Sequence, residues 1–291
     1  MNNMAADVPP LQGPLRDLGW KGKYRHDDPE VVRLREQLDA EAGIPGLELI
    51  DPQEDGFAEH AARVFHRDGF VLIKDVLDAE RLEILRSGCD KVIRHMLAHD
   101  DDPDRPRVGN RGSHRYSFGS APAHFGAQFE WSMMIDPPVL DAVLTAIFGS
   151  DQYILGSGLT SGGDFNIPGS VEYQHLHRDF GDFLSSATQA GGPASNTGQW
   201  LAVPPPVVQA NFPLEVLSGS AVAHTRSNGA TRCIPGTHHT NKPIPSEEDE
   251  PKWMKMMVTG PVPAGCAMLR DLRTWHGVSG RIHAAALVIS Y

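Results

Sequence analysis

The chain has 291 residues and a formal net charge of −11, with 37 acidic against 26 basic residues. No run of Lys and Arg stands out, which argues against nucleic acid and anionic membranes as partners. The cysteines Cys89, Cys233 and Cys266 show no CxxC spacing and fit reduced thiols better than a disulfide framework. Neither a secretory leader nor an apolar run long enough to cross a bilayer is visible. We therefore expect a soluble, cytoplasmic protein.

The first half of the chain has the spacing of helices. Residues 1–27 are rich in Pro, Gly and charged residues and predict a loosely held arm. Helices are expected at 28–43, 56–67, 78–96 and 136–148, where apolar residues recur every three or four positions. Residues 70–73 form a continuous apolar run and predict a short buried strand. Residues 107–131 have no clear period, and we expect a loop that either wraps over a site or is a plain surface loop. Residues 185–206 are rich in Gly, Ser, Asn and Pro and predict a lid or a disordered loop.

From about residue 152 the pattern changes to short strands separated by turns. The expected strands cover 152–159, 171–180, 207–217, 230–234, 265–270 and 282–291. Clusters such as Gly162-Gly163-Asp164 are typical of the turns between them. Helices followed by a run of antiparallel strands predict a mainly β, α+β fold, with a jelly-roll core at 151–291 buttressed by helical support at 28–150. No internal repeat is visible, so 28–291 is expected to be one domain.

Two side chains in the run Gln174-His175-Leu176-His177-Arg178-Asp179 carry the main chemical signal. In an extended strand, residues i and i+2 point to the same face, so His177 and Asp179 present a nitrogen and an oxygen to one point. His276, far downstream beside a buried-looking apolar run, is the best candidate for a third ligand. Two histidines and one carboxylate with open positions are the ligand set of non-haem Fe(II) oxygenases.

Other interpretations of these histidines stay open. His175 lies on the same face as His177 and could replace it as the ligand. The carboxylate would then be four residues away, roughly 13 Å along a strand, which is too far for one metal. We therefore give His175 a supporting role. An ordinary strand with a surface Asp179 is the plain alternative. A metal enzyme on a cupin-like barrel that uses no 2-oxoglutarate is another, because His224, His238 and His239 offer further imidazoles, although Pro235-Gly236-Thr237-His238 is more typical of a turn.

Four stretches, in the same order along the chain, resemble the phytanoyl-CoA dioxygenase-like family over roughly residues 55–291. They are Phe57 to Leu77 with His66-Arg67-Asp68-Gly69-Phe70, the HxD run at His177, Asn228-Gly229-Ala230-Thr231-Arg232-Cys233-Ile234-Pro235-Gly236-Thr237-His238, and Pro263-Ala264-Gly265 with Trp275-His276-Gly277. The resemblance implies a double-stranded β-helix, Fe(II) held by His177, Asp179 and His276, and 2-oxoglutarate and O2 as cosubstrates. An inactive barrel that has lost its iron is the remaining rival.

The resemblance also implies residues around the iron. In the family an arginine after the distal histidine binds the far carboxylate of 2-oxoglutarate, and Arg281 is the candidate, although it lies closer to His276 than is usual. Arg270 and Arg273 are fallbacks that we expect to be exposed near a barrel rim. Asn166 resembles a polar residue near the cosubstrate, with a turn-forming Asn as the alternative. Phe183 resembles an aromatic residue that lines the substrate pocket, with a core aromatic as the alternative.

The expected substrate is a small molecule. Halogenating relatives carry Gly or Ala where this chain keeps Asp179, so hydroxylation, or desaturation by the same chemistry, is favoured. An acyl-CoA substrate would require a basic patch for its phosphates, and the overall charge of −11 argues against one. The most basic local cluster comprises Arg105, Arg107, Arg111, His114 and Arg115. That cluster suits either a carboxylated or phosphorylated substrate or a solvated loop. The pattern predicts no oligomeric state.

Overall fold

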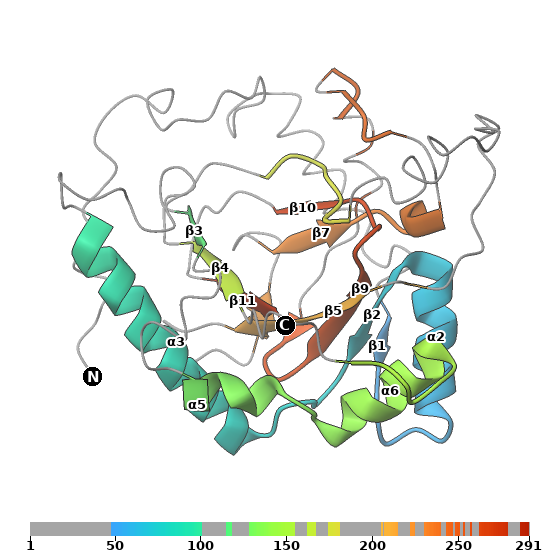
Figure 1. The fold of residues 1–291 in the computed structure, drawn as a ribbon, viewed down its shortest axis with the longest axis horizontal. Helices are drawn as coiled ribbons and strands as arrows, with labels where there is room; N and C mark the ends of the chain where they lie inside the picture. Colours follow the sequence, from blue (N-terminus) through green and yellow to red (C-terminus); the bar gives the residue numbers. More distant parts are fainter. Residues whose placement is uncertain are drawn as a thin grey trace.

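The structure of the chain is a computed structural model, and Figure 1 shows its ribbon. The described residues are 48–100, 115–117, 128–154, 162–166, 174–180, 205, 207–214, 222–224, 230–239, 243–246, 248–250, 253, 257, 262–278 and 286–290. The expected arm at 1–27 and helix at 28–43 lie outside these residues, as does most of the expected loop at 185–206.

The helices that the sequence predicts after residue 50 are confirmed. They are α2 (Phe57–Asp68), α3 (Ala79–Asp100) and α6 (Pro138–Phe148). The structure adds three short helices that the sequence does not predict: α5 (Gln128–Trp131), η3 (Ser132–Met134) and η4 (Thr237–His239). Asp78 caps α3, because its Oδ1 accepts the Arg81 backbone N–H at 2.8 Å. Pro138 opens α6, and Gly149 ends it in the left-handed region at φ 66°.

Seven strands form one large sheet. Their order across the sheet is β1 (Leu49–Ile50), β2 (Phe70–Ile73), β9 (Ala267–Asp271), β5 (Val208–Leu214), β11 (Ala286–Ser290), β4 (Gly162–Asn166) and β3 (Arg115–Ser117). β1 and β2 run parallel, and every other neighbouring pair is antiparallel. Together with the helices this sheet gives a mixed α+β fold, as the sequence predicts.

Two smaller pairs complete the described strands: β7 (Thr231–Cys233) with β10 (His276–Val278), and β6 (Val222–His224) with β8 (Val262–Pro263). The extended segment 174–178 lies along the free side of β10, through a bridge between His177 and His276 and a bond from Gln174 N–H to Val278 C=O. Segment 174–178, β10 and β7 make up a small layer. Along the chain its members alternate with strands of the large sheet, in the order β4, 174–178, β5, β7, β9, β10, β11, while β6 and β8, which pair with each other, flank β7.

Alternate residues of the central strands pack against different layers. Val71, Leu269 and Phe212 belong to the main core, which they share with the helices. Leu72 and Met268, one position along, instead pack in a second cluster that includes Cys233 of β7 and Val262 of β8. The large sheet therefore separates the helices, which lie below and beside it in Figure 1, from β7 and β10 above it.

Residues 152–154, the described part of the expected strand 152–159, form no strand, and residues 174–180 of the expected strand 171–180 form only a bridge at His177. Two further local predictions are wrong. Gly162-Gly163-Asp164, expected to be a turn, begins β4, because β4 is paired on both sides by β11 and β3. The expected loop 107–131 contains β3 and α5, and Tyr116 of β3 stacks on Phe165 of β4 with ring centroids 4.8 Å apart. In both cases partners distant in sequence supply the hydrogen bonds and contacts.

In the part of the chain that the structure describes, no helix is both long and apolar enough to span a membrane.

Candidate metal centre

Backbone pairing brings His177 and His276 together. The His177 N–H donates to the His276 C=O at 2.9 Å, and the His276 N–H donates back to the His177 C=O at 2.8 Å. In this antiparallel pair the two side chains stand on the same face, and their ring centroids are 4.1 Å apart. The register between segment 174–178 and β10 thus sets the distance between the two imidazoles.

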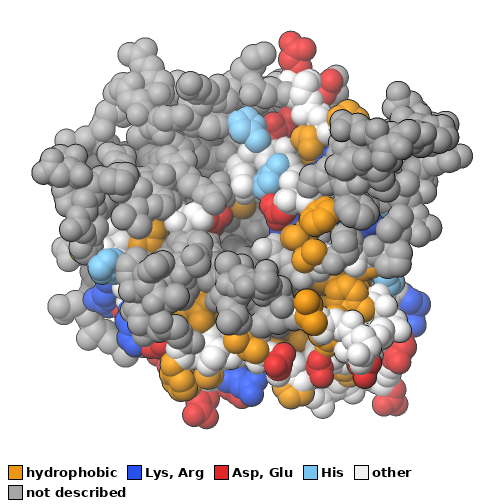
Figure 2. All heavy atoms as spheres, in the orientation of Figure 1, with side chains coloured by type: hydrophobic (Ala, Val, Ile, Leu, Met, Phe, Trp, Pro, Cys, Tyr) orange, Lys and Arg blue, Asp and Glu red, His pale blue; other side chains and the backbone are white. Residues whose placement is uncertain are grey.

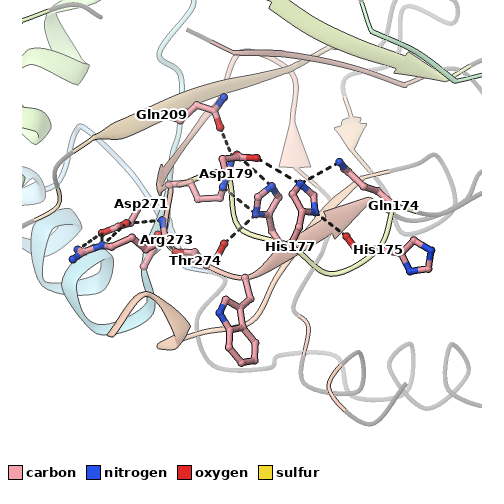
Figure 3. A network of polar contacts seen from close by, with 12 residues as sticks. Gln174, His175, His177, Asp179, Gln209, Asp271, Arg273 and Thr274 are labelled. Atoms are coloured by element: carbon pink, nitrogen blue, oxygen red, sulfur yellow. Dashed lines mark hydrogen bonds and ion pairs between the residues drawn. The ribbon is translucent and has the colours of Figure 1, made fainter. Parts of the chain in front are cut away.

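Asp179 completes the group (Figure 3). Its backbone N–H donates to the Leu272 C=O at 3.1 Å, which turns the chain back over the imidazoles. Asp179 Oδ1 lies 3.5 Å from His177 Nε2, and Oδ2 lies 3.4 Å from His276 Nε2. One potential ligand atom from each of the three residues lies within 4.8 Å of the others. On the face of the molecule drawn in Figure 2, histidine and acidic side chains meet near the centre.

Both imidazoles are oriented by backbone carbonyls. His177 Nδ1 donates to the His175 C=O at 2.7 Å, so its Nε2 faces the group as an acceptor. His276 Nδ1 has two neighbours, the Thr274 C=O at 3.0 Å and Arg270 Nη1 at 3.1 Å. These two contacts require opposite tautomers. A His276 that offers the Nε2 lone pair to a metal carries its proton on Nδ1 and donates it to Thr274, so it accepts no bond from Arg270.

The electrostatic surroundings keep His276 and Asp179 in the form that a cation requires. Burial, together with the charges of Arg270 and His177, lowers the pKa of His276 to about 3. Burial alone would raise the pKa of Asp179, but the hydrogen bond with His177 and the charges of Arg270 and His276 outweigh it. The pKa of Asp179 is therefore held well below its usual range. A neutral imidazole and an ionised carboxylate are ready-made ligands at neutral pH.

The donor set fits a divalent transition metal. Two imidazole nitrogens and one carboxylate oxygen on one side of an ion leave the other side open, which is the arrangement of non-haem Fe(II) oxygenases. The Gln174 side-chain amide donates to His177 Nε2 at 3.1 Å, so that nitrogen is now hydrogen-bonded and Gln174 lies next to the metal position. Among the described residues this is the one group of histidine, cysteine and acidic side chains with metal-binding geometry.

The other residues that the sequence singles out are placed as follows. Arg281 and Phe183 lie outside the described residues. Asn166 ends β4, where its backbone pairs with Ala286 and Arg115, and its side chain is not described. His238 does not join the group, as expected. Its Nε2 and that of His239 both donate to the His66 C=O, at 3.1 and 2.8 Å, and so satisfy a carbonyl near the end of α2.

The expectation for Arg270 and Arg273 is wrong. Arg270 is 2% exposed, and it extends from β9 to the carboxylate of Asp179. Arg273 is mostly buried and binds Asp271 through Nη2 at 2.5 Å. The apolar run Cys266 to Leu269 predicts a buried strand, and in the structure the burial continues through Arg270 and Asp271. A partner such as Asp179, which lies 91 residues upstream, cannot be identified from strand spacing.

Sequence reasoning also missed Glu250, which stabilises the segment that carries His177. Glu250 is 3% exposed, and its carboxylate accepts the Leu176 backbone N–H at 2.7 Å and pairs with His175 Nδ1 at 2.9 Å. His175 thus has the supporting role expected of it. No local pattern around residue 250 marks it, since its partners lie some 75 residues upstream.

A family model, Phytanoyl-CoA dioxygenase (PhyH), matches residues 65–284. The chain belongs to the phytanoyl-CoA dioxygenase family. This confirms the resemblance drawn from the sequence, and it places the chain among the Fe(II)- and 2-oxoglutarate-dependent oxygenases. No curated protein matches the chain.

Several solved structures share the fold of this chain at low sequence identity. AviO1 from Streptomyces viridochromogenes Tue57 has a TM-score of 0.52 and 18% identity, over 80% of this chain and 93% of AviO1. EctD from S. alaskensis, solved with 2-oxoglutarate and 5-hydroxyectoine, has a TM-score of 0.50 and 19% identity, over 82% of this chain and 76% of EctD. EvdMO1 has a TM-score of 0.52 and 17% identity, over 79% of this chain and 48% of EvdMO1.

Proposed function

We propose that the chain is an Fe(II)/2-oxoglutarate-dependent dioxygenase that hydroxylates an unactivated C–H bond of a small molecule. The observation that carries the proposal is the group of His177, Asp179 and His276, whose ligand atoms lie within 4.8 Å of one another in a chain of this family. Desaturation by the same chemistry is the second outcome, because Asp179 keeps the carboxylate ligand that halogenating relatives lack.

When bound, iron with O2 and 2-oxoglutarate supplies the oxidising power, with release of succinate and CO2. The chain's own residues hold and orient the ligands. His177 and His276 present their Nε2 atoms because their Nδ1 atoms face the carbonyls of His175 and Thr274. Asp179 supplies the negative charge, and Gln174 lies next to the metal position, where its amide can donate to a ligand of the iron.

We further propose that the core is a double-stranded β-helix within a single domain that spans 28–291. The alternation between the large sheet and the small layer supports this, because consecutive segments of a jelly roll cross between two facing sheets. In such a barrel His177 and His276 lie on neighbouring strands of one sheet, with Arg270 on the sheet that faces them.

For the cosubstrate and substrate, we propose 2-oxoglutarate and a small organic molecule, and neither nucleic acid nor membrane. EctD, a structural neighbour, was solved with 2-oxoglutarate and the small molecule 5-hydroxyectoine. Arg281 remains our candidate for the far carboxylate of 2-oxoglutarate, with Asn166 near the cosubstrate and Phe183 in the substrate pocket.

The test combines metal, cosubstrate and variants. Anaerobic addition of Fe(II) and 2-oxoglutarate to the purified protein should produce a weak visible charge-transfer band, and O2 should then release succinate. His177→Ala and Asp179→Ala should each abolish iron-dependent succinate release, because two ligands hold the metal poorly. His60→Ala on α2 is the matched control and should retain activity.

Three results would count against the proposal. Iron-dependent succinate release that survives in both ligand variants would show that the ligands are wrongly assigned. Turnover with no requirement for 2-oxoglutarate would favour a cupin-like metal enzyme of another kind. A wild-type protein without the band and without succinate release would favour an inactive barrel.

A further inference from the structure

Arg270 is a charged side chain in a strand without an exposed face. All five residues of β9 are buried, and Arg270 keeps 2% of its surface exposed. A guanidinium is not deprotonated in a protein, so its charge must be balanced inside the fold. Charged residues are seldom buried to this extent without a partner, which makes the surroundings of Arg270 informative.

The counter-ion of Arg270 is the carboxylate of Asp179. Arg270 Nη2 lies 2.6 Å from Asp179 Oδ2 and also donates to Gln209 Oε1, which lies opposite it on β5. No other carboxylate lies within ion-pair distance of Arg270 among the residues that the structure describes. Arg270 Nε makes no hydrogen bond, so the guanidinium keeps one unused N–H donor beside the metal group.

Arg270 and the metal would use different oxygens of the Asp179 carboxylate. Asp179 Oδ2 accepts the hydrogen bond from Arg270, whereas Oδ1 lies 3.5 Å from His177 Nε2. A charge-assisted bond of 2.6 Å is among the strong ones, so Oδ1 is the oxygen left for the metal. The Asp179 side chain is 35% exposed, and Arg270 is therefore the contact that fixes its orientation from the buried side.

We propose that Arg270 is a positioning residue that anchors the carboxylate ligand of the metal centre, whether that carboxylate belongs to Asp179 or to a small anion. The proposal rests on the metal-binding role of His177, Asp179 and His276 put forward above. It has a specific consequence for Asp179→Ala. This change leaves a buried cation with no counter-ion next to the vacated ligand position, where a small carboxylate has both a charge partner and a metal to bind.

The experiment measures Mn(II) affinity in the absence of 2-oxoglutarate and O2, so the readout does not depend on turnover. Arg270→Gln should weaken Mn(II) binding about 10- to 100-fold, the usual effect of removing a group that orients a metal ligand. Arg270→Lys keeps the charge and should lie between the wild type and Arg270→Gln. Arg273→Gln, at the neighbouring arginine that pairs with Asp271, is the matched control and should bind Mn(II) as the wild type does.

The decisive comparison adds formate or formamide to the Asp179 variants. In Asp179→Ala, millimolar formate should restore Mn(II) affinity at least tenfold, whereas neutral formamide should not. In the double variant Asp179→Ala/Arg270→Gln, formate should have no effect. Should the double variant fail to fold, the comparison of formate with formamide on Asp179→Ala still tests the role of the charge.

The inference is overturned if formate rescues the single and double variants equally, if formamide acts as well as formate, or if Arg270→Gln binds Mn(II) as tightly as the wild type. A purely structural role would lower the melting temperature of Arg270→Gln without a selective loss of Mn(II) affinity. A wild type that binds no Mn(II) contradicts the proposed function itself, so the two failures are distinguishable.

Discussion

At the scale of single residues, histidines in this fold do three different tasks that composition cannot separate. His177 and His276 offer Nε2 to one point, and His175 supports the segment from behind. His238 and His239 satisfy a carbonyl at the end of α2. The hydrogen-bond partner of each ring decides which task it performs, since that partner sets the tautomer and the direction of the remaining lone pair.

The burial of His238 predicts a pH dependence of stability. Burial, and secondly the charge of His239, lower its pKa to about 4, whereas Asp271 acts in the opposite sense and Arg273 adds to the lowering. Since the folded pKa lies below the unfolded value near 6.5, the unfolded chain takes up a proton first as pH falls. Stability is therefore lost between about pH 6.5 and 4, by roughly 3 kcal/mol for this group.

Urea unfolding of the metal-free protein at several pH values checks this prediction. His238→Asn should lose less stability than the wild type as pH falls from about 6.5 to 4, because the proton uptake of the unfolded chain at this position is gone. The same substitution at His60 is the control for the loss of one histidine. An unchanged pH dependence in His238→Asn would mean that His238 is not held neutral.

At the scale of elements, the metal group depends on how closely segment 174–178 approaches β10. Gly277 permits this approach, because a Cβ at residue 277 would lie 2.5 Å from the Gln174 carbonyl oxygen. The Gln174 N–H bonds Val278 next to it, so the two backbones are in direct contact there. A side chain at 277 must separate the strands that carry His177 and His276.

Gly277→Ala should therefore reduce metal affinity by at least tenfold, a larger effect than its loss of stability alone would produce. The matched control is Gly149→Ala after α6, where φ is 66° but an added Cβ meets nothing within 4 Å. That control should cost about 1 kcal/mol of stability from backbone strain and leave metal affinity unchanged. Titration with Mn(II), together with melting temperatures, compares the two. Equal metal affinity in Gly277→Ala and the wild type would contradict the role of the close approach.

At the scale of the whole molecule, the metal centre connects two layers. His177 and His276 belong to the small layer, whereas Arg270 of the large sheet binds Asp179. The hydrophobic contacts of Leu72 and Met268 with Cys233 hold the same two layers together. A metal bound at the group thus adds a link between layers that already pack through apolar side chains.

Metal should accordingly stabilise the folded chain. At a Mn(II) concentration of about 100 times the Kd, the free energy of unfolding should rise by roughly 2.7 kcal/mol. Thermal unfolding with Mn(II) and with excess chelator measures the difference. The shift should vanish in His177→Ala, and a shift of equal size in that variant would mean that Mn(II) binds elsewhere.

Local patterns in the sequence were sufficient for the three long helices and for five of the eleven strands that the structure describes, namely β2, β5, β7, β9 and β11. Asp78 and Gly149 mark helix ends by their own chemistry, and the alternation at His177 and Asp179 places two ligands on one face without knowledge of the fold. Short strands such as β1, β6 and β8 escaped detection because two or three residues hold no period. β4 was mistaken for a turn because its glycines gain strand structure through pairing with β11.

The sequence by itself determined the family, the class of chemistry and the three candidate ligands, because these depend on residue types at short spacing or on the order of motifs along the chain. Tertiary structure alone decided that Arg270 lies inside against Asp179, that Glu250 supports the segment of His177 and that His238 serves α2. The physical reason is that a buried polar group is defined by its partners, and these partners are brought close by strand pairing between residues that are distant in the chain.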